Sequence, residues 1–292
     1  MGYGDEIMAS GYARLAKQQF PELQILIGNK EKLLVYDSII YKNNPNITLI
    51  DQVNPKIKRM WIENFPNNRP YLKKITKDKI FWNMEYRAIK GDIFFDKSES
   101  IYANNIINES KKHWFQNNTK EYKAIIFIET TSNKTSSNPE IFRYKHLNKD
   151  WGIEKWNELI NQLSSEYLII QSFHNDSYKH KNIFQFNSTF RKACSVLNLC
   201  DFYVGPEGGF GHASAALNIP SVIYFGGWIS PKTTGYNFHK NIYVDVEDSP
   251  CGVYGYLCKH CEYCRNSVSV EYMNEAIFLS LKKNNIINKI KN

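Results

Sequence analysis

The sequence predicts an α/β protein built from two α/β domains whose parallel sheets face a cleft. Short apolar strands alternate with helical segments along most of the chain, which is typical of parallel sheets with right-handed crossover connections. A polar break over residues 117–120 separates two such stretches. The 292 residues, of which 42% are hydrophobic, are enough for two cores. We therefore expect an amino-terminal domain over residues 1–120, a carboxy-terminal domain over 121–270 and a final helix over 271–292.

The amino-terminal half begins with a glycine turn at Gly4, and we expect a helix from there to about Lys17. A short helix is expected over residues 30–36, and a longer one ends near Gln116. Segment 52–92 is rich in aromatic residues and has no clear periodicity. Short apolar runs predict three strands, over residues 23–28, 47–51 and 93–96.

The carboxy-terminal half alternates more regularly. The apolar run that begins at Ala124 and ends at Glu129 is typical of a strand buried on both faces of a parallel sheet. Further strands are predicted over residues 167–170, 201–205 and 221–226. Helices are predicted over residues 151–163, 190–197 and 210–217.

The net charge indicates which classes of partner are expected. There are 37 Lys and Arg against 29 Asp and Glu, so the formal net charge is +8. This surplus favours anionic partners such as nucleotides, phosphorylated sugars or acidic lipids, although scattered lysines also serve solubility. We expect no nucleic-acid partner, because no recognised binding motif is present. The apolar content excludes a mainly disordered chain.

The ends of the chain bear on location. No apolar run approaches the roughly 18 residues of a spanning helix, and the start shows no secretory signal. We therefore expect a cytoplasmic protein. The basic tail over residues 281–291 carries Ile286, Ile287 and Ile290 between its lysines. It could rest on the anionic inner face of a membrane, or it could be a terminal helix that frays.

The strongest site signal is the glycine-rich turn between a predicted strand and a predicted helix at residues 205–212. Gly208 and Gly209 leave bare backbone N–H groups at the start of the helix, where hydrogen bonds and the helix dipole attract an anion. His212 can donate to a phosphate oxygen, and Glu207 can accept from a sugar hydroxyl. A turn that serves only chain reversal is the alternative.

Two further residues are candidates. Asp5 lies at the mouth of the first helix, where a carboxylate is often only a cap but can also act as a general base. Lys149 precedes the helix that begins at Trp151 and could reach a diphosphate. A solvated lysine is the ordinary interpretation of such a residue.

Four cysteines crowd into one loop together with His260. Two overlapping C-x-x-C pairs can place thiolates around a tetrahedral zinc ion, and the same spacing could hold three corners of an iron–sulfur cluster. Free thiols are the ordinary interpretation in a reducing compartment. These cysteines are Cys251, Cys258, Cys261 and Cys264.

Taken together, these segments resemble glycosyltransferase family 9, the ADP-heptose:lipopolysaccharide heptosyltransferases and their relatives. The matching segments follow the family order from residue 2 to about residue 280, and residues 29–120 match nothing specific. The cysteine loop, followed by residues 268–271, also looks like the cysteine-bearing stretch before the last helix of that family, which makes zinc less expected. The matching segments are residues 2–5, 149–151, 205–209, 212–216, 220–226 and 230–231.

The resemblance implies a GT-B fold of two Rossmann-like domains, with the acceptor on the amino-terminal domain and the nucleotide sugar on the carboxy-terminal one. It also implies an inverting, metal-independent transfer of a heptose or hexose from a nucleotide-diphosphate sugar to a glycan or lipid-linked acceptor. By position, Asp5 matches the catalytic base and Lys149 the lysine that neutralises the diphosphate. Thr130 and Thr131 match a phosphate-contacting pair, and residues 207–212 match the donor loop. A non-catalytic binding protein of the same fold is the alternative.

The chain departs from the family pattern in three places. Glu207-Gly208-Gly209 stands where the family usually has Asp-Thr/Ser-Gly, and an insert over residues 133–147 separates the threonine pair from Lys149. The strand that usually precedes the first glycine turn is missing, so either the start is truncated or the first sheet lacks its central strand.

Overall fold

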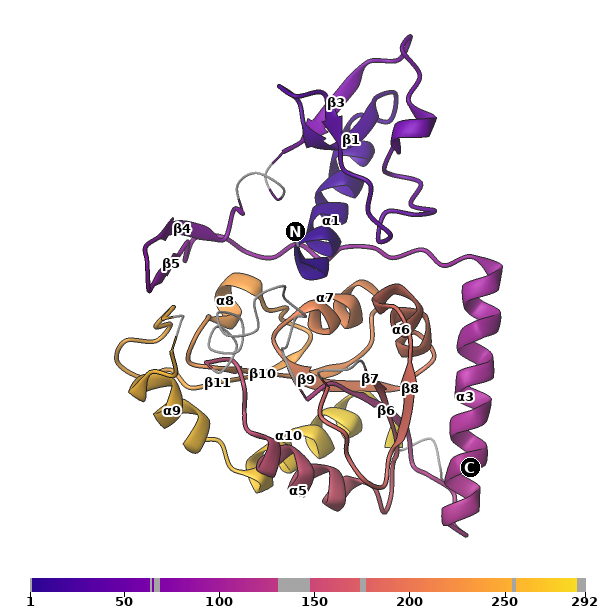
Figure 1. The fold of residues 1–292 in the computed structure, drawn as a ribbon, viewed down its shortest axis with the longest axis vertical. Coiled ribbons are helices and arrows are strands. Elements are labelled where there is room, and N and C mark those ends of the chain that lie inside the picture. Colours follow the sequence, from indigo (N-terminus) through magenta and orange to yellow (C-terminus); the bar gives the residue numbers. More distant parts are fainter. Residues whose placement is uncertain are drawn as a thin grey trace.

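The computed structural model describes residues 2–63, 65, 69–130, 148–173, 177–253 and 256–287. It consists of a large carboxy-terminal part built on one sheet and a smaller amino-terminal part that lies against one side of it (Figure 1). No helix of these residues is long and apolar enough to cross a membrane.

The large part is organised around a six-stranded sheet in the order β11-β10-β9-β6-β7-β8, and all its strand pairs are parallel. The four central strands confirm the apolar runs predicted from the sequence. The two outermost strands were not predicted, because their polar, partly exposed residues give no apolar run. The strands are β6 Ile125–Ile128, β7 Leu168–Phe173, β8 Phe184–Asn187, β9 Phe202–Pro206, β10 Ser221–Gly226 and β11 Lys240–Tyr243.

Helices cover both faces of this sheet (Figure 1). Residues Ile126 and Ile128 of β6 belong to one apolar core with α5 and α10, whereas Ile125 and Phe127 belong to the other with α6 and α7. This alternation follows from the two-residue period of a strand. The covering helices are α5 Ile153–Leu163, α6 Phe190–Leu197, α7 Gly209–Ala216 and α10 Val270–Lys283.

The basic tail after α10 uses its apolar residues internally. Leu281 is fully buried, and Ile286 and Ile287 pack against the core beneath α10. Ile290 lies outside the described residues. The isoleucines expected to face a membrane are therefore largely occupied by the protein itself.

The amino-terminal sheet has the predicted number of strands, but only β1 coincides with a predicted one. It has three strands in the order β2-β1-β3, of which β1 and β3 are parallel and β2 is antiparallel to β1. It packs against α1, which runs from Tyr3 to Gln19. The strands are β1 Gln24–Asn29, β2 Leu34–Val35 and β3 Arg59–Ile62.

Three expected elements of this half were wrong. Residues 30–36 reverse the chain in a turn with Leu33 at φ +49°, and β2 follows in place of a helix. Residues 47–51 place apolar side chains on the core but continue into a 3-10 helix, η1 Ile50–Gln52. Residues 93–96 are extended and unpaired, because Asp96 already caps the next helix by accepting from the Glu99 amide at 2.9 Å.

A hairpin and a long helix complete the fold. The hairpin consists of β4 Leu72–Ile75 and β5 Ile80–Trp82, which pair with each other in a two-stranded sheet. Helix α3, Lys97–Asn117, packs on α6 and on β7 and β8, and thus against the carboxy-terminal sheet. Two short helices follow β10, α8 Pro231–Thr234 and α9 Lys259–Asn266.

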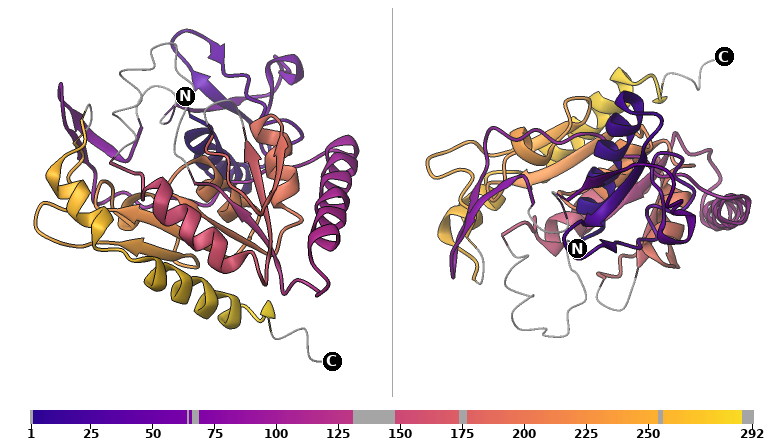
Figure 2. Two further views of the ribbon diagram at one scale, coloured as in Figure 1. Left: turned by 60° about the horizontal axis from the view of Figure 1, so that its bottom comes forward. Right: turned by 90° about the horizontal axis from the view of Figure 1, so that it is seen from above.

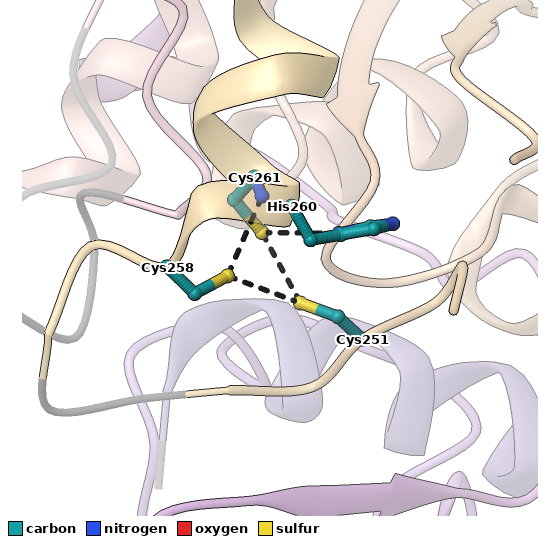
Figure 3. A group of neighbouring side chains, drawn as sticks. All are labelled: Cys251, Cys258, His260 and Cys261. Atoms are coloured by element: carbon teal, nitrogen blue, oxygen red, sulfur yellow. Dashed lines mark hydrogen bonds between the residues drawn. The ribbon is translucent and has the colours of Figure 1, made fainter. Parts of the chain in front are cut away.

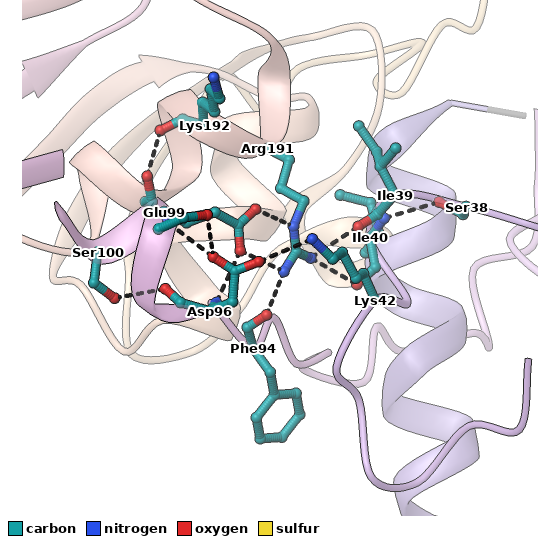
Figure 4. Close-up of polar contacts among 12 residues, drawn as sticks. Ser38, Ile39, Ile40, Lys42, Phe94, Asp96, Glu99, Ser100, Arg191 and Lys192 are labelled. Carbon is teal, nitrogen blue, oxygen red and sulfur yellow. Dashed lines mark hydrogen bonds and ion pairs between the residues drawn. The ribbon is translucent and has the colours of Figure 1, made fainter. Parts of the chain in front are cut away.

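Arg191 of α6 ties the two parts together (Figure 4). Its guanidinium donates to both carboxylate oxygens of Glu99, at 2.5 and 2.9 Å, and to the carbonyl oxygen of Ile39 at 2.8 Å. It also donates to the Phe94 carbonyl oxygen. Arg191 is 4% exposed and Glu99 is 7% exposed. The buried Arg191 thus connects α6 to α3 and to the amino-terminal segments at Ile39 and Phe94.

We expect Arg191→Met to lower the free energy of unfolding by about 3–5 kcal/mol, because it leaves the Glu99 carboxylate buried without its partner. Urea denaturation followed by circular dichroism measures this. The exposed neighbour Lys192 offers a matched control, and Lys192→Met should change the free energy of unfolding by about 0.5 kcal/mol or less. Equal losses for the two variants would contradict the role assigned to Arg191.

Candidate active site

The two glycine turns singled out in the sequence meet in the structure. The start of α1 lies against the start of α7, and a Cβ placed on Gly4 would come within 2.7 Å of the His212 ring. The Tyr3 ring stacks on Phe190 at 4.4 Å between ring centroids. Glycine at position 4 therefore allows the two helix ends to touch, and Asp5 comes to lie beside the turn at residues 207–212.

Asp5 is 6% exposed and both of its carboxylate oxygens have partners. Tyr71 donates its hydroxyl to Oδ1 at 2.5 Å, and the Arg69 Nε lies 3.2 Å from Oδ2. The Gly2 amide also donates to Oδ2, at 3.3 Å, which is the capping contact expected of an acid at this position. The carboxylate is thus held in one orientation from two directions.

Sequence reasoning missed Tyr71 and Arg69, because they lie in the aromatic segment without periodicity. Burial, and then the charge of Asp5, raises the pKa of Tyr71 well above its ordinary value. Tyr71 therefore stays a neutral phenol that donates to the carboxylate. Its ring packs near Trp82 and Tyr86, with centroids 6.4 and 6.1 Å away.

Lys149 and Glu207 form an ion pair at the carboxyl end of β9. Lys149 Nζ also lies 4.6 Å from the centroid of the Trp228 ring. Burial would raise the pKa of Glu207, but the charge of Lys149 and the contacts of His212 outweigh it and hold this pKa well below its usual range. Glu207 is therefore a carboxylate whose charge is balanced inside the protein.

His212 sits between Glu207 and a tyrosine. Its Nε2 lies 3.8 Å from Glu207 Oε1, and its Nδ1 is 2.8 Å from the Tyr236 hydroxyl. Because burial raises the pKa of Tyr236, that hydroxyl is protonated. The Glu207 carboxylate, the His212 ring and the Tyr236 hydroxyl thus form one polar row.

The turn itself remains accessible. A Cβ on Gly208 would meet no atom within 4 Å, so open space adjoins the start of α7. The first amides of a helix have no intrahelical acceptor and point toward such space. A small pocket adjoins the turn, with a cavity volume of about 10 Å³, and it is lined by Glu207, His212, Thr234 and Asn241 among others.

Thr130 is placed differently from the rest of the predicted site. Thr130 is fully buried after β6, and its hydroxyl lies 2.8 Å from His180 Nε2. Its amide donates to Glu129 Oε1 at 2.9 Å. Both polar groups of Thr130 are therefore engaged inside the protein. Thr131 and the predicted insert over residues 133–147 lie outside the described residues.

The cysteine loop forms a compact cluster (Figure 3). Ligand atoms of Cys251, Cys258, His260 and Cys261 all lie within 4.8 Å of one another, a grouping that can hold a metal ion. Cys251 Sγ is 3.8 Å from Cys258 Sγ and 3.2 Å from Cys261 Sγ. Cys264 lies outside this group, with its Sγ 3.8 Å from His260 Nε2. His260 therefore takes the place that the sequence suggested for Cys264.

The cluster is attached to the residue before Lys149. The Asn148 side chain donates to the carbonyl oxygens of Val253 and Tyr256 at 2.6 and 3.0 Å. It accepts from the Cys258 amide at 3.2 Å. The loop also holds Trp228, whose Nε1 donates to the Val253 carbonyl oxygen at 2.6 Å. The cysteine loop thus supports the backbone that carries Lys149 and the ring beneath it.

No protein-family model matches the sequence, and no curated protein matches it in sequence. Solved structures do match in fold. The glycosyl transferase family 9 protein of Veillonella parvula is 13% identical, with 97% of this chain and 95% of that chain covered and a TM-score of 0.58. ADP-heptose lipopolysaccharide heptosyltransferase II of E. coli is 11% identical, with 97% of each chain covered and a TM-score of 0.56.

A third likeness is to the iron-containing dodecameric glycosyltransferase TibC of enterotoxigenic E. coli. It is 12% identical, with 97% of this chain and 74% of that chain covered and a TM-score of 0.57. These likenesses span nearly the whole chain and confirm the predicted GT-B fold and the resemblance to family 9 at the level of fold. These likenesses establish the fold and do not establish the activity.

Proposed function

We propose that this protein is a glycosyltransferase that moves a sugar from a nucleoside-diphosphate donor to a hydroxyl of a glycan or lipid-linked acceptor, with inversion. One observation carries the proposal: Asp5, Lys149 and the open start of α7 converge from both parts of the molecule at the meeting point of the two glycine turns. A base, a cation and bare amides are the groups that such a transfer requires.

Asp5 takes the acceptor proton in this proposal. The acceptor oxygen attacks the anomeric carbon, its proton passes to the Asp5 carboxylate, and the bond from that carbon to the diphosphate breaks on the opposite face. Tyr71 and Arg69 are positioning residues, because they fix the direction of the carboxylate. We expect the acceptor hydroxyl to approach Asp5 Oδ2, on the side of the half-exposed Arg69 side chain.

Lys149 and the amides of Gly208 and Gly209 hold the leaving diphosphate. Lys149 is already placed by Glu207 and Trp228, so its charge needs no reorganisation when negative charge develops. His212 supports this arrangement through Glu207, and Glu207 is also placed to accept from a donor hydroxyl. No step of this route requires a bound metal.

The runner-up is a nucleotide-sugar-binding protein without catalysis, which the internal pairing of Lys149 with Glu207 favours. A thermal-shift series with ADP, GDP, UDP and their hexose conjugates tests binding, because a ligand that binds only the folded state raises the melting temperature. Diphosphate release on adding candidate acceptors then separates the two functions. Binding without release identifies a binding protein, and absence of both would refute the common site.

We also propose that Cys251, Cys258, His260 and Cys261 hold a structural metal ion. Bonds of about 2.3 Å from a tetrahedral zinc to sulfur imply sulfur–sulfur distances of about 3.8 Å. The Cys251–Cys258 distance of 3.8 Å matches this value, whereas the Cys251–Cys261 distance of 3.2 Å would have to lengthen on binding. Ser249 lies 2.9 Å from His260 Nε2, which leaves Nδ1 on the side of Cys261. TibC is described as iron-containing, so iron and zinc are both candidates.

We expect about one metal ion per chain when the purified protein is assayed by mass spectrometry of the elements. Cys258→Ser should lose the ion and lower the melting temperature, because a structural metal stabilises the folded state. Cys264→Ser, outside the four-ligand group, should retain the metal. A wild-type protein without metal would show that these cysteines are free thiols.

A further inference from the structure

The β4–β5 hairpin has one face fixed to the carboxy-terminal part. Trp82 is buried, with its ring edge-on to Trp228 at 4.9 Å between centroids. Its Nε1 donates to the Trp228 carbonyl oxygen at 2.9 Å. The Ile80 amide donates to the Gly252 carbonyl oxygen at 2.8 Å. These contacts hold the hairpin in place beside the candidate active site.

Most of the segment 73–81 faces outward, except Ile80, which packs against the core. Ile75 is 56% exposed and Phe81 is 43% exposed. Ile75 pairs with Ile80 across the strands, so it lies on the opposite face of the hairpin from Phe81. Phe81 pairs across the strands with Lys74, and Lys79 Nζ lies 5.5 Å from the centroid of its ring. The face of the hairpin that carries Phe81 is therefore exposed.

This outward surface is strongly basic. It has four lysines, Lys73, Lys74, Lys77 and Lys79, against one acid, Asp78, so its formal charge is 4 − 1 = +3. Among the residues that the structure describes, none of these lysines forms an ion pair. Their charge is therefore available to a partner.

We propose that residues 73–81 dock the protein onto an anionic lipid bilayer. Lysines on long apolar stems attract lipid headgroups while Ile75 and Phe81 enter the boundary of the acyl chains. A charged glycan would use the lysines alone and would leave these two apolar side chains in water. The combination of unpaired lysines with exposed apolar residues fits an anionic lipid surface.

The residues that precede β4 relate the docking surface to the candidate active site. Arg69 and Tyr71 precede β4 and contact Asp5, so a bilayer at the hairpin lies on the side from which the acid is reached. The docking stands independently of the proposed transfer, since it uses no residue of the reaction. It also replaces the basic tail as the membrane contact, because Ile286 and Ile287 pack on the protein.

Sedimentation of the full chain with phosphatidylcholine vesicles, with and without phosphatidylglycerol, tests the proposal. We expect binding only when phosphatidylglycerol is present. Each lysine near an anionic surface contributes about 1 kcal/mol, or about fivefold in affinity. The triple variant Lys73→Gln/Lys74→Gln/Lys77→Gln should therefore bind about a hundredfold more weakly. Phe81→Ser, which keeps the charge, should weaken binding about tenfold.

The matched control is Lys111→Gln/Lys112→Gln/Lys120→Gln, which removes the same charge at and just beyond α3, across the molecule from the hairpin (Figure 2). It should bind the vesicles like the wild type, as should Lys282→Gln/Lys283→Gln in the tail. The proposal is overturned if the wild type does not bind phosphatidylglycerol, or if either control loses as much affinity as the hairpin variant. It is also overturned if Phe81→Ser binds unchanged, which would show that the lysines bind the headgroups without insertion of apolar side chains.

Discussion

Asp5→Asn is expected to lower the rate of sugar transfer by about 10²–10⁴-fold, the usual contribution of a positioned base. The amide has the shape of the carboxylate and keeps an oxygen that can accept from the Tyr71 hydroxyl, so the folded structure should persist. It has no affinity for the acceptor proton at neutral pH. The affinity for the nucleotide should stay unchanged, because the diphosphate contacts Lys149 and α7 in the proposed complex.

The measurement combines nucleotide binding by calorimetry with diphosphate release during transfer. Glu6→Gln is the matched control, since Glu6 is the next acid along α1 and accepts from the Ser38 hydroxyl at 2.5 Å instead of facing the turn. It should transfer at the wild-type rate. Normal turnover by Asp5→Asn would show that another group removes the proton.

Lys149→Met has the second large expected effect. It removes the cation that we place on the leaving diphosphate, and a preorganised charge of this kind is worth about 3 kcal/mol of barrier, or 10²–10³-fold in rate. It also leaves the Glu207 carboxylate buried without its cation, which by itself destabilises a protein by about 3–5 kcal/mol. The single variant therefore mixes two effects.

The double variant Lys149→Met/Glu207→Gln separates them. Removing both charges should restore most of the stability lost in the single variant, because no unpaired charge remains buried. Transfer and nucleotide binding should stay weak, because the cation is still missing. If the double variant recovers nucleotide affinity, Lys149 serves only to neutralise Glu207 and the proposed contact with the diphosphate is wrong.

Local sequence accounted for the carboxy-terminal half far better than for the amino-terminal half. The runs at β6, β9 and β10 are apolar because both faces of these strands are buried, and burial on both sides leaves a continuous signal. The strands β8 and β11 lie at the sheet edges, where polar residues are tolerated. In the amino-terminal half, the short apolar run over residues 47–51 packs on the core without pairing in a sheet.

Local sequence likewise predicted only part of the candidate site. Glycine turns are local features, so Asp5 and the turn at residues 207–212 could be named from the sequence. Tyr71 reaches Asp5 across 66 positions of the chain, and no local pattern encodes that contact. Thr130 was predicted from the resemblance to face a phosphate, but its hydroxyl is turned toward His180, a partner 50 positions away.

The sequence by itself determined the central strands, the two glycine turns and the cysteine loop, because each depends on residues that are neighbours along the chain. The tertiary structure alone decided that the two turns touch, that Lys149 pairs with Glu207, and that His260 joins three cysteines. It also decided which lysines remain unpaired at the hairpin. Contacts of this second kind depend on how distant segments pack, and periodicity and composition carry no record of that packing.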